Sequence, residues 1–274
     1  MAQPLDILIN IAKEIYSRVN PMLGTPIASR IVGFGFGGDR SRLIDVAAER
    51  AAIDYLEKNN LSCIFVGEEF GVKRIGSSPE FYLVVDGVDG TNNAIRGIKF
   101  TSSSLAISPT ERLGDIEAAV VMDLKDGGIF SAEKGRGAKY NGQEIKPSGI
   151  SNLKDAIVSV DISRSIESIE RTLPIMGRVK CLRALGAASL EICYVASGLL
   201  DAYIDLRGML RTIDFAAGML IIRESGGVFL QPSGEDIPQD TLLTEVKRFS
   251  VIASANRSLF NEIMMLINSI RKAT

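Results

Sequence analysis

Apolar and polar positions alternate with a helical period over the first twenty residues of the chain. Apolar side chains recur at the three- and four-residue spacing of one helix face: Leu5, Leu8, Ile9, Ala12, Ile15, Tyr16 and Val19. Pro21 follows and ends the pattern. We therefore predict an amphipathic first helix, and a second over residues 44–59 after the glycine-rich stretch GFGFGGDR.

Short apolar runs bounded by turn residues predict strands in the rest of the first half. They lie at residues 61–66, 81–85, 105–108, 118–124 and 128–132. Lys125-Asp126-Gly127 separates the last two, which indicates a hairpin. Strands that follow one another through hairpins favour an α+β arrangement for residues 1–150.

After about residue 150 the predicted strands and helices alternate along the chain. Strands are predicted at 157–160, 202–206 and 251–253, and helices at 187–196, 214–224 and 257–271. This alternation is typical of an α/β fold. We expect an N-terminal α+β half over residues 1–150 and a C-terminal α/β half over residues 151–274.

Composition places the chain among soluble globular proteins. Its 274 residues are 46% hydrophobic and 23% charged, and 31 basic and 33 acidic residues give a net charge of −2. Without a basic excess we expect no nucleic-acid partner, and no apolar run reaches the roughly 20 residues that span a membrane. The N-terminal residues lack the basic start of a signal peptide, so we expect a cytoplasmic protein.

Histidine is absent, which excludes several mechanisms. Ser-His-Asp hydrolases, phosphohistidine phosphatases and His-ligated zinc enzymes all need an imidazole. A cysteine phosphatase needs an arginine six positions after its cysteine, but Cys63, Cys181 and Cys193 are followed there by Glu69, Ala187 and Leu199. The chemistry must therefore use carboxylates, hydroxyls, Lys, Arg or a bound metal.

Acidic residues stand at the ends of predicted elements, most clearly in the stretch VVDGVDGTNN. An apolar strand runs directly into Asp86, and Asp89 follows three residues later. Glu68 follows the strand 61–66, and Asp214 opens the helix 214–224. Buried carboxylates repel each other and lose hydration, which a fold tolerates when a cation binds them. In open α/β sheets the site lies beyond the carboxyl ends of the strands, where these acids could meet.

Oxygen ligands without His or Cys favour Mg²⁺, with Mn²⁺ also possible. Two such ions can activate a water and neutralise phosphate oxygens during displacement at phosphorus. Taken singly, each acid also has a commoner structural role. Asp86 could form an Asx-turn, Asp214 could cap its helix, and Glu68 could be a solvated loop residue.

Three blocks of the chain resemble the inositol monophosphatase family. They are GEE at 67–69, DGVDGTNN at 86–93, and IDFAAG at 213–218 followed by ESGG at 224–227. Weaker likeness extends to Ser41–Asp45 and to Arg183, Gly186 and Ala188, and IDLRG at 204–208 looks like the archaeal branch, which is also similar to fructose-1,6-bisphosphatases. Three residues depart from the pattern without removing a metal ligand: Gly87 for Pro, Ile213 for Trp and Ala94 for an aromatic residue. Gly87 leaves the loop between the two aspartates less rigid.

The resemblance implies a layered αβαβα sandwich of the sugar-phosphatase type, two or three Mg²⁺ ions and a homodimer. Glu68, Asp86 and the backbone carbonyl of Val88 would bind the first ion. Asp86, Asp89 and Asp214 would bind the second. Thr91 would hydrogen-bond the attacking water, which Glu68 would help to orient or deprotonate. Asp39, on the glycine-rich loop, could bring a third ion.

The same resemblance implies hydrolysis of small sugar or polyol phosphates, namely inositol 1-phosphate, fructose 1,6-bisphosphate or both. The backbone amides of Gly90 and Thr91 would hold phosphate oxygens. Further substrate contacts are expected from Gly186, Ala187 and Asp205, the last accepting a hydrogen bond from a hydroxyl. One or two arginines could bind a second phosphate, and the candidates are Arg164, Arg183, Arg207 and Arg211. Nucleotide 2′- or 3′-phosphates or NADP are the alternative substrates.

Three other functions fit parts of the sequence less well. Gly33, Gly35 and Gly38 satisfy G-x-G-x-x-G, but only residues 27–32 could form the strand that a dinucleotide-binding loop requires before it. The D-x-D-G-T signature of aspartyl-phosphate phosphatases has its acids two residues apart, whereas Asp86 and Asp89 lie three apart. A metal-stabilised fold without catalysis would leave so many repelling acids without a purpose.

Overall fold

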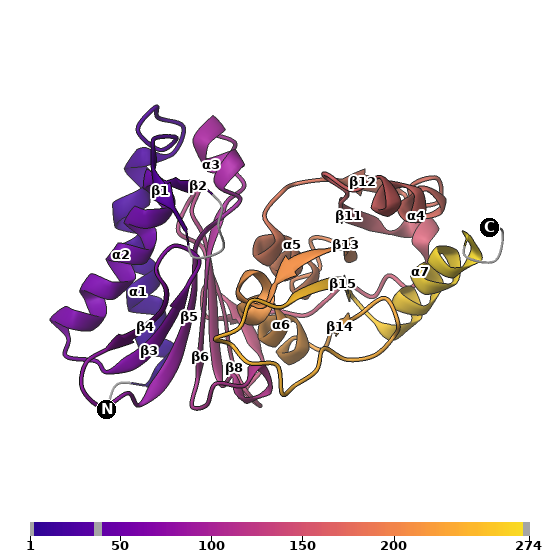
Figure 1. Cartoon of the computed structure of the whole chain (residues 1–274). Coiled ribbons are helices and arrows are strands. Elements are labelled where there is room, and N and C mark those ends of the chain that lie inside the picture. The colour runs from indigo at the N-terminus through magenta and orange to yellow at the C-terminus, as the bar shows by residue number, and fades with distance from the viewer. Residues whose placement is uncertain (1–2, 36–39, 271–274) are drawn as a thin grey trace.

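The computed structural model describes residues 3–35 and 40–270, which form alternating layers of helix and sheet (Figure 1). Along the layered axis, α1 and α2 are followed by a large sheet, then α5 and α6, a smaller sheet, and α4 and α7. The helices are α1 (Pro4–Val19), α2 (Leu43–Lys58), α3 (Thr91–Arg96), α4 (Ile166–Met176), α5 (Ala188–Ala196), α6 (Thr212–Glu224) and α7 (Arg257–Ile270). The predicted αβαβα sandwich is confirmed.

The larger sheet has eight strands in the order β10-β9-β8-β7-β6-β5-β3-β4. Its strands are β3 (Cys63–Gly67), β4 (Gly71–Ile75), β5 (Phe81–Asp89), β6 (Ser102–Ser108), β7 (Ala118–Asp123), β8 (Ile129–Glu133), β9 (Ala138–Tyr140) and β10 (Gln143–Glu144). Strands β3 and β5 pair in parallel, and the other neighbours in this sheet are antiparallel. The carboxyl ends of β3 and β5 therefore lie side by side at the same end of the strands.

The smaller sheet has five strands in the order β12-β11-β13-β15-β14. They are β11 (Ile157–Asp161), β12 (Cys181–Arg183), β13 (Ala202–Arg211), β14 (Val228–Leu230) and β15 (Arg248–Ser254). Its strands come from residues after 150, as the alternation of strands and helices indicated. However, α5 and α6 from this part of the chain also pack on the larger sheet. A division into halves at residue 150 stays a prediction.

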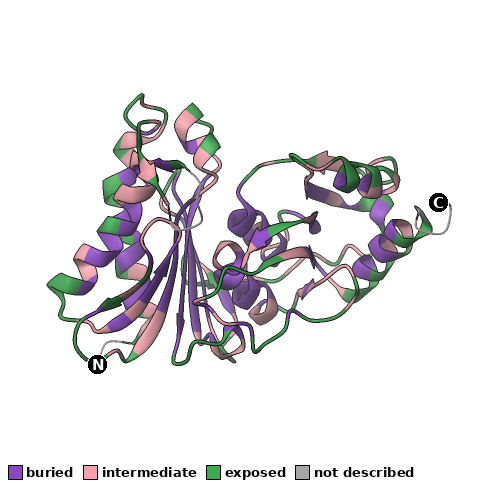
Figure 2. Cartoon of the chain, viewed as in Figure 1, coloured by how far each residue is buried: buried purple, intermediate pink, exposed green. Residues whose placement is uncertain are grey.

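Three hydrophobic cores hold the layers together, and Figure 2 shows their buried residues along the inner faces of the helices and sheets. One core joins α1 and α2 to the larger sheet. The central core lies around α5 and α6, between the two sheets. The third joins the smaller sheet to α7 and the end of α4. None of the helices within the described ranges is long and apolar enough to cross a membrane.

Strands β5 and β13 extend well beyond the apolar runs that predicted them. Strand β5 continues beyond Val85 to Asp89, and a bulge between Asp86 and Asp89 shifts its register against β6. Strand β13 continues to Arg211 through a similar irregularity. In both strands the apolar residues stop before the backbone hydrogen bonding between strands stops. The sequence therefore placed the carboxyl ends of β5 and β13 too early. It also did not predict α3, α4 or the short strands β4, β9, β10, β12 and β14.

The glycine-rich stretch does not have the context of a dinucleotide-binding loop. Strands β1 (Ile31–Phe34) and β2 (Arg40–Arg42) flank it and pair antiparallel with each other. A dinucleotide-binding loop would connect a parallel strand to a helix instead. Gly33 and Gly35 belong to this segment, while Gly38 and Asp39 lie outside the described residues.

Candidate active site

The predicted metal ligands meet at the end of the parallel pair β3 and β5. Gly67 pairs with Val85, so the residues that follow them, Glu68 and Asp86, lie beside each other. The amino-terminal ends of α5 and α6 face the same place. The resulting cavity of about 210 Å³ contains the five ligands predicted for the first two ions. Its lining is Glu68, Asp86, Val88, Asp89, Gly90, Thr91, Asp161, Gly186, Ala188, Arg207, Leu210, Arg211 and Asp214.

Asp86 is the most deeply buried of these acids, with 5% of its surface exposed. Burial raises the pKa of its carboxyl well above the ordinary value, and the nearby carboxylates Asp89, Glu68 and Asp214 raise it further. Its position follows from the sequence, because the apolar strand β5 carries it into the interior. The group therefore needs a compensating cation to remain charged.

Asp89 is held by the first turn of α5. Its Oδ1 accepts from the Ala188 amide at 3.2 Å, and its Oδ2 accepts from the amide and the hydroxyl of Ser189 at 2.7 Å each. Burial raises the pKa of Asp89 to about 6, and the Ser189 hydrogen bonds oppose that rise. The amino-terminal, positive end of α5 thus fixes the position of this carboxylate.

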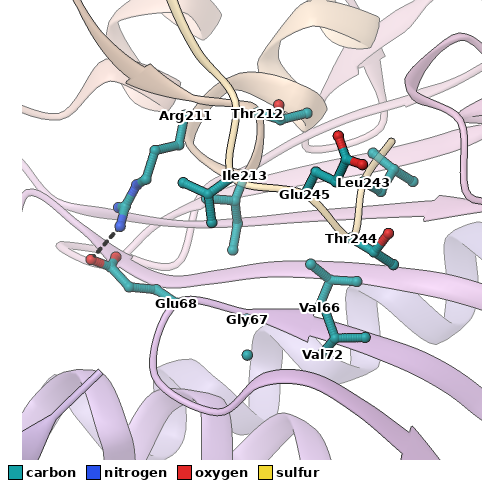
Figure 3. A pocket seen from close by; sticks show the side chains of 12 residues that line it. Val66, Gly67, Glu68, Val72, Arg211, Thr212, Ile213, Leu243, Thr244 and Glu245 are labelled. Carbon is teal, nitrogen blue, oxygen red and sulfur yellow. Dashed lines mark hydrogen bonds and ion pairs between the residues drawn. The ribbon is translucent and has the colours of Figure 1, made fainter. Parts of the chain in front are cut away.

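Arg211 is the cation between Glu68 and Asp214 in this structure. Its Nη1 donates to Glu68 Oε1 at 2.7 Å, and its Nη2 donates to Asp214 Oδ1 at 2.8 Å. Figure 3 shows the contact with Glu68 at the edge of a second, more apolar pocket beside the site. Burial lowers the pKa of Arg211, but Asp214 and Glu68 more than offset this and hold its pKa above the ordinary value.

Asp214 lies at the third position of α6 and completes a capping box with Arg211, the residue before the helix. Its Oδ2 accepts from the Arg211 amide at 2.7 Å. The sequence placed Asp214 at the start of the helix, and the structure begins α6 two residues earlier, at Thr212. Burial raises the pKa of Asp214, whereas the Arg211 guanidinium lowers it.

Thr91 lies between Asp45, which was not predicted as a site residue, and Val88, a predicted metal ligand. Its Oγ1 is 3.0 Å from Asp45 Oδ1 and 3.1 Å from the Val88 carbonyl oxygen, so its single proton is shared between two acceptors. Burial raises the pKa of Asp45 to about 8, the Thr91 hydrogen bond opposes that rise, and repulsion from Glu69 and Glu68 adds to it. The likeness over Ser41–Asp45 was the signal that could have identified Asp45.

Glu49, one turn after Asp45 on α2, holds the loop that carries the ligand Glu68. Its two carboxylate oxygens accept from the amides of Glu69 at 2.9 Å and Phe70 at 3.0 Å. Burial raises the pKa of Glu49 to about 7, and those amides oppose the rise. In the sequence, Glu49 falls on the same helix face as the buried apolar residues of α2. An acid on that face was the signal that Glu49 has a buried partner.

The donor set fits a divalent cation. Within the described ranges, no three acidic, cysteine or histidine side chains are yet close enough together to hold a metal ion. The acids nevertheless line one cavity, and their mutual repulsion raises the pKa of Asp86. All of the donors are oxygens, the ligands that Mg²⁺ prefers. Arg211 now contacts two of these donors, Glu68 Oε1 and Asp214 Oδ1.

Gly90 and Gly186 bring the β5 end and the α5 start into contact. Both have left-handed backbones, with φ values of +84° and +85°. A Cβ on Gly90 would lie 3.0 Å from the Gly186 carbonyl oxygen and 3.1 Å from the Ala187 Cβ. Ala187 is fully buried and supports this contact, while Gly186 lines the cavity.

The predicted substrate arginines do not all reach the site. Arg164 and Arg207 line an adjoining cavity of about 580 Å³, together with Arg211 and Arg248. Arg183 instead points to the surface, where its guanidinium donates to the neighbouring Leu182 carbonyl at 2.8 Å. It lines none of the cavities found around the acids in the described residues.

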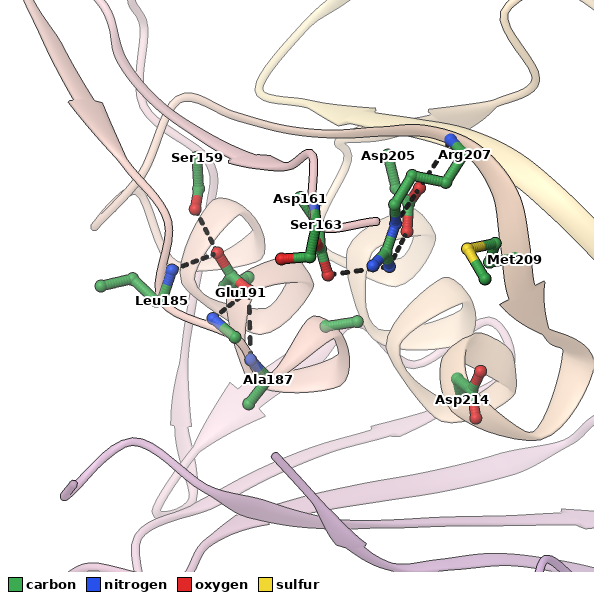
Figure 4. A network of polar contacts seen from close by, with 12 residues as sticks. Ser159, Asp161, Ser163, Leu185, Ala187, Glu191, Asp205, Arg207, Met209 and Asp214 are labelled. Atoms are coloured by element: carbon green, nitrogen blue, oxygen red, sulfur yellow. Dashed lines mark hydrogen bonds and ion pairs between the residues drawn. The ribbon is translucent and has the colours of Figure 1, made fainter. Parts of the chain in front are cut away.

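Asp205 does not face the substrate side, which corrects the expectation that it accepts from a substrate hydroxyl. Its side chain is fully buried, and its Oδ1 and Oδ2 accept from Arg207 Nε at 3.0 Å and Nη2 at 2.6 Å. Asp161 holds the same Nη2 at 2.7 Å, and Figure 4 shows the guanidinium between the two acids. Asp205 therefore positions Arg207.

Glu191 on α5 holds the loop that contains Gly186. Its carboxylate accepts from the amides of Leu185 at 3.3 Å and of Gly186 and Ala187 at 3.2 Å each, and from the Ser159 hydroxyl (Figure 4). Burial raises the pKa of Glu191 to about 7, and the Ser159 hydrogen bond opposes that rise. Sequence reasoning missed this residue, although an acid in the otherwise apolar helix ASLEICYVA was a signal.

The raised pKa values predict that stability falls with rising pH when divalent cations are chelated. Burial raises the pKa values of Asp45, Glu49, Asp89 and Glu191 to about 8, 7, 6 and 7, from ordinary values of 3.8 for Asp and 4.5 for Glu. Between about pH 4 and 8 the folded chain binds more protons than the unfolded chain, so the free energy of unfolding decreases. Each acid contributes about 1.4 kcal/mol per pH unit inside its own window.

Thermal unfolding in EDTA from pH 5 to pH 8.5 at constant ionic strength measures this effect. Glu191→Gln, whose side chain cannot titrate, should show a shallower decline than the unchanged chain. Stability that rises over this range would show that the buried acids are charged and compensated at neutral pH.

The comparisons with known proteins agree with this geometry. The inositol monophosphatase family matches residues 37–272. A fructose-1,6-bisphosphatase/inositol-1-monophosphatase of Methanothermobacter thermautotrophicus is 35% identical over 279 residues, covering 96% of each chain. The crystal structure of an inositol monophosphatase–fructose 1,6-bisphosphatase has a TM-score of 0.84 and 30% identity, covering 97% of this chain and 100% of its own.

A second kind of relative is longer. A bifunctional NADP phosphatase/NAD kinase of Methanococcus maripaludis is 36% identical over 271 residues, which cover 91% of this chain. The chain spans only 47% of that relative's length. The similarity therefore concerns about half of the bifunctional protein.

Proposed function

The chain belongs to the inositol monophosphatase family and is a phosphoric monoester hydrolase, and we propose that it cleaves the phosphate esters of small sugars or polyols. Inositol 1-phosphate and fructose 1,6-bisphosphate are the proposed substrates. The observation that carries the proposal is the convergence of Glu68, Asp86, Asp89 and Asp214 around one cavity with Thr91. Such a set of oxygen donors suits a metal-assisted attack of water on phosphorus.

Glu68, Asp86 and the Val88 carbonyl would hold one Mg²⁺, and Asp86, Asp89 and Asp214 a second. Divalent cations bound there would lower the pKa of a bound water and neutralise the phosphate oxygens. Mn²⁺ suits the same donors. A third ion at Asp39 and a homodimer remain predictions.

Thr91 and Asp45 would orient the attacking water. The Thr91 hydroxyl donates toward Asp45 and Val88, so the lone pairs of its oxygen can accept a hydrogen bond from the water. In its ionised form Asp45, which accepts from Thr91 Oγ1 at 3.0 Å, would receive a proton passed on through Thr91. Glu68, which lines the same cavity as Thr91, would help to orient or deprotonate the water.

The backbone amides of Gly90 and Thr91, at the start of α3, would hold phosphate oxygens. Arg164 and Arg207 would bind the remainder of a charged substrate from the adjoining cavity of about 580 Å³. Arg164 also lines a further cavity of about 360 Å³ with Arg40 and Arg42. This supply of guanidinium groups suits a substrate with two phosphates.

NADP is a second candidate substrate. The relative from Methanococcus maripaludis named as an NADP phosphatase is 36% identical to this chain. The cavities of about 580 and 360 Å³, which share Asn92 and Arg164, offer the longer groove that a dinucleotide needs. Hydrolysis of its 2′-phosphate would use the same acids.

Phosphate release tests the proposal directly. We expect release from inositol 1-phosphate or fructose 1,6-bisphosphate in Mg²⁺, no release after treatment with EDTA, and recovery when Mg²⁺ is added back. NADP should be assayed beside them with equal amounts of enzyme. Full activity in EDTA would contradict the metal-assisted mechanism, and release from NADP alone would move the assignment to the second candidate.

A further inference from the structure

The Arg211 guanidinium lies among the acids rather than facing a substrate. Only 15% of its side chain is exposed, and it contacts Glu68 and Asp214 at 2.7 and 2.8 Å. The partners lie on opposite sides, Glu68 after β3 of the larger sheet and Asp214 in α6. Arg211 therefore joins two parts of the site that are 143 residues apart in the chain.

The guanidinium holds the carboxylate atoms that a metal ion would need. Asp214 Oδ2 accepts from the Arg211 backbone amide at 2.7 Å and from Arg211 Nε at 3.3 Å. Oδ1 accepts from Arg211 Nη2 and, at 3.1 Å, from Nε. Glu68 Oε1 accepts from Nη1. A cation at this place would compete with the guanidinium for the lone pairs of these oxygens.

Arg211 has an alternative place within reach. Besides the acidic cavity it lines the neighbouring cavity of about 580 Å³. Three other arginines are found there: Arg164, Arg207 and Arg248. The positive charge that two carboxylates stabilise in the first cavity would be stabilised by an anion in the second.

We propose that Arg211 competes with the divalent cation for Glu68 and Asp214. When the cation binds, Arg211 turns toward the arginine-lined cavity of about 580 Å³. The proposal rests on the function proposed above, because it takes these acids as metal ligands. Its consequence is an order of events. Metal binding releases a guanidinium to the substrate side, so that cation and substrate anion favour each other's binding.

Calorimetric titration with Mg²⁺, without substrate and at pH 8 in low salt, tests the competition. We expect Arg211→Met to bind Mg²⁺ about tenfold more tightly than the unchanged chain, a difference of about 1.4 kcal/mol. Arg248→Met is the matched control. It removes one positive charge from the same region, but the contact that the structure shows for Arg248 is to the Met209 carbonyl rather than to an acid. Its Mg²⁺ affinity should change less than about threefold.

Arg211→Lys is a second variant that keeps the charge at this position. A single ammonium cannot reproduce the two-sided contact of the guanidinium, so an intermediate Mg²⁺ affinity is expected. It also serves if the methionine variant does not fold. In the unchanged chain, the arginine Nε–H NMR signal that the lysine variant lacks should shift when Mg²⁺ is added.

Titration with inorganic sulfate tests the second half of the proposal. In the unchanged chain Mg²⁺ should tighten sulfate binding, and Arg211→Met should lose at least half of that gain. An equal gain in both would show that Arg211 does not move to the anion side.

The failures are distinguishable. If the unchanged chain binds no Mg²⁺, the proposed function itself is contradicted. If it binds Mg²⁺ but Arg211→Met binds it no more tightly than Arg248→Met does, Arg211 is not a competitor. Weaker binding in Arg211→Met would make the residue a support for the metal site instead.

Discussion

Replacing Asp86 by asparagine should lower phosphate release by at least about a thousandfold and at the same time raise the stability of the protein in EDTA. Asp86 is the one side chain proposed to bind both ions, and loss of metal stabilisation of several kcal/mol corresponds to three or more orders of magnitude in rate. Its carboxyl is also buried beside other acids, which raise its pKa. A neutral amide removes that repulsion.

The two effects are measured separately. Phosphate release is followed in saturating Mg²⁺, and thermal unfolding in EDTA at pH 8, where about 1 kcal/mol shifts Tm by about 2–4 °C in a chain of this size. Asp123→Asn is the matched control, since Asp123 is a buried acid with a pKa raised by burial but lies outside the site. An Asp86→Asn protein with normal turnover would contradict the metal assignment. A lower Tm would show that Asp86 is compensated by other groups.

Replacing Gly90 by alanine should destabilise the protein by about 2–5 kcal/mol and reduce turnover at least tenfold. An L-residue with φ near +84° costs about 1–2 kcal/mol. The new Cβ would also lie 3.0 Å from the Gly186 carbonyl oxygen and 3.2 Å from the Phe100 carbonyl oxygen, and relieving such overpacking costs about 1–3 kcal/mol more. Relief would displace the phosphate-binding amides, and a misplacement of about 1 Å can cost about a hundredfold in rate.

Gly142→Ala separates the two causes of that loss. Gly142 has a similar φ of +81°, but a Cβ there would meet nothing within 4 Å. Urea unfolding of this variant should show the backbone cost alone, with turnover unchanged. Equal destabilisation by both substitutions would show that the backbone near Gly186 accommodates the new Cβ without a loss of stability.

Gly87 shows how a correct observation in the sequence led to an incomplete interpretation. The sequence suggested that Gly87, in place of proline, loosens the segment between Asp86 and Asp89. In the structure a Cβ at Gly87 would lie 2.7 Å from the Ala48 Cβ and 3.3 Å from the Glu49 amide nitrogen. The glycine lets α2 approach β5 closely, and this approach brings Asp45 and Glu49 toward the site.

The sequence determined most of the longer helices and strands and the acids at their ends. Apolar runs that stop at Glu68 and Asp86 specify where two strands leave the core, and local hydrophobic pattern is sufficient for that. The absence of histidine limited the ligands to oxygen donors. The parallel pairing of β3 and β5 brings Glu68 and Asp86 together. This pairing belongs to the fold that the family resemblance implied.

The tertiary structure decided which partner each charged group has. Arg211 contacts Glu68 across 143 residues, Glu191 binds the Gly186 loop, and Asp205 turns inward to Arg207 rather than to a substrate. No local pattern encodes these pairings. The partner of a buried charge depends on which groups packing brings within about 3 Å, and on which of them must be compensated after losing contact with water.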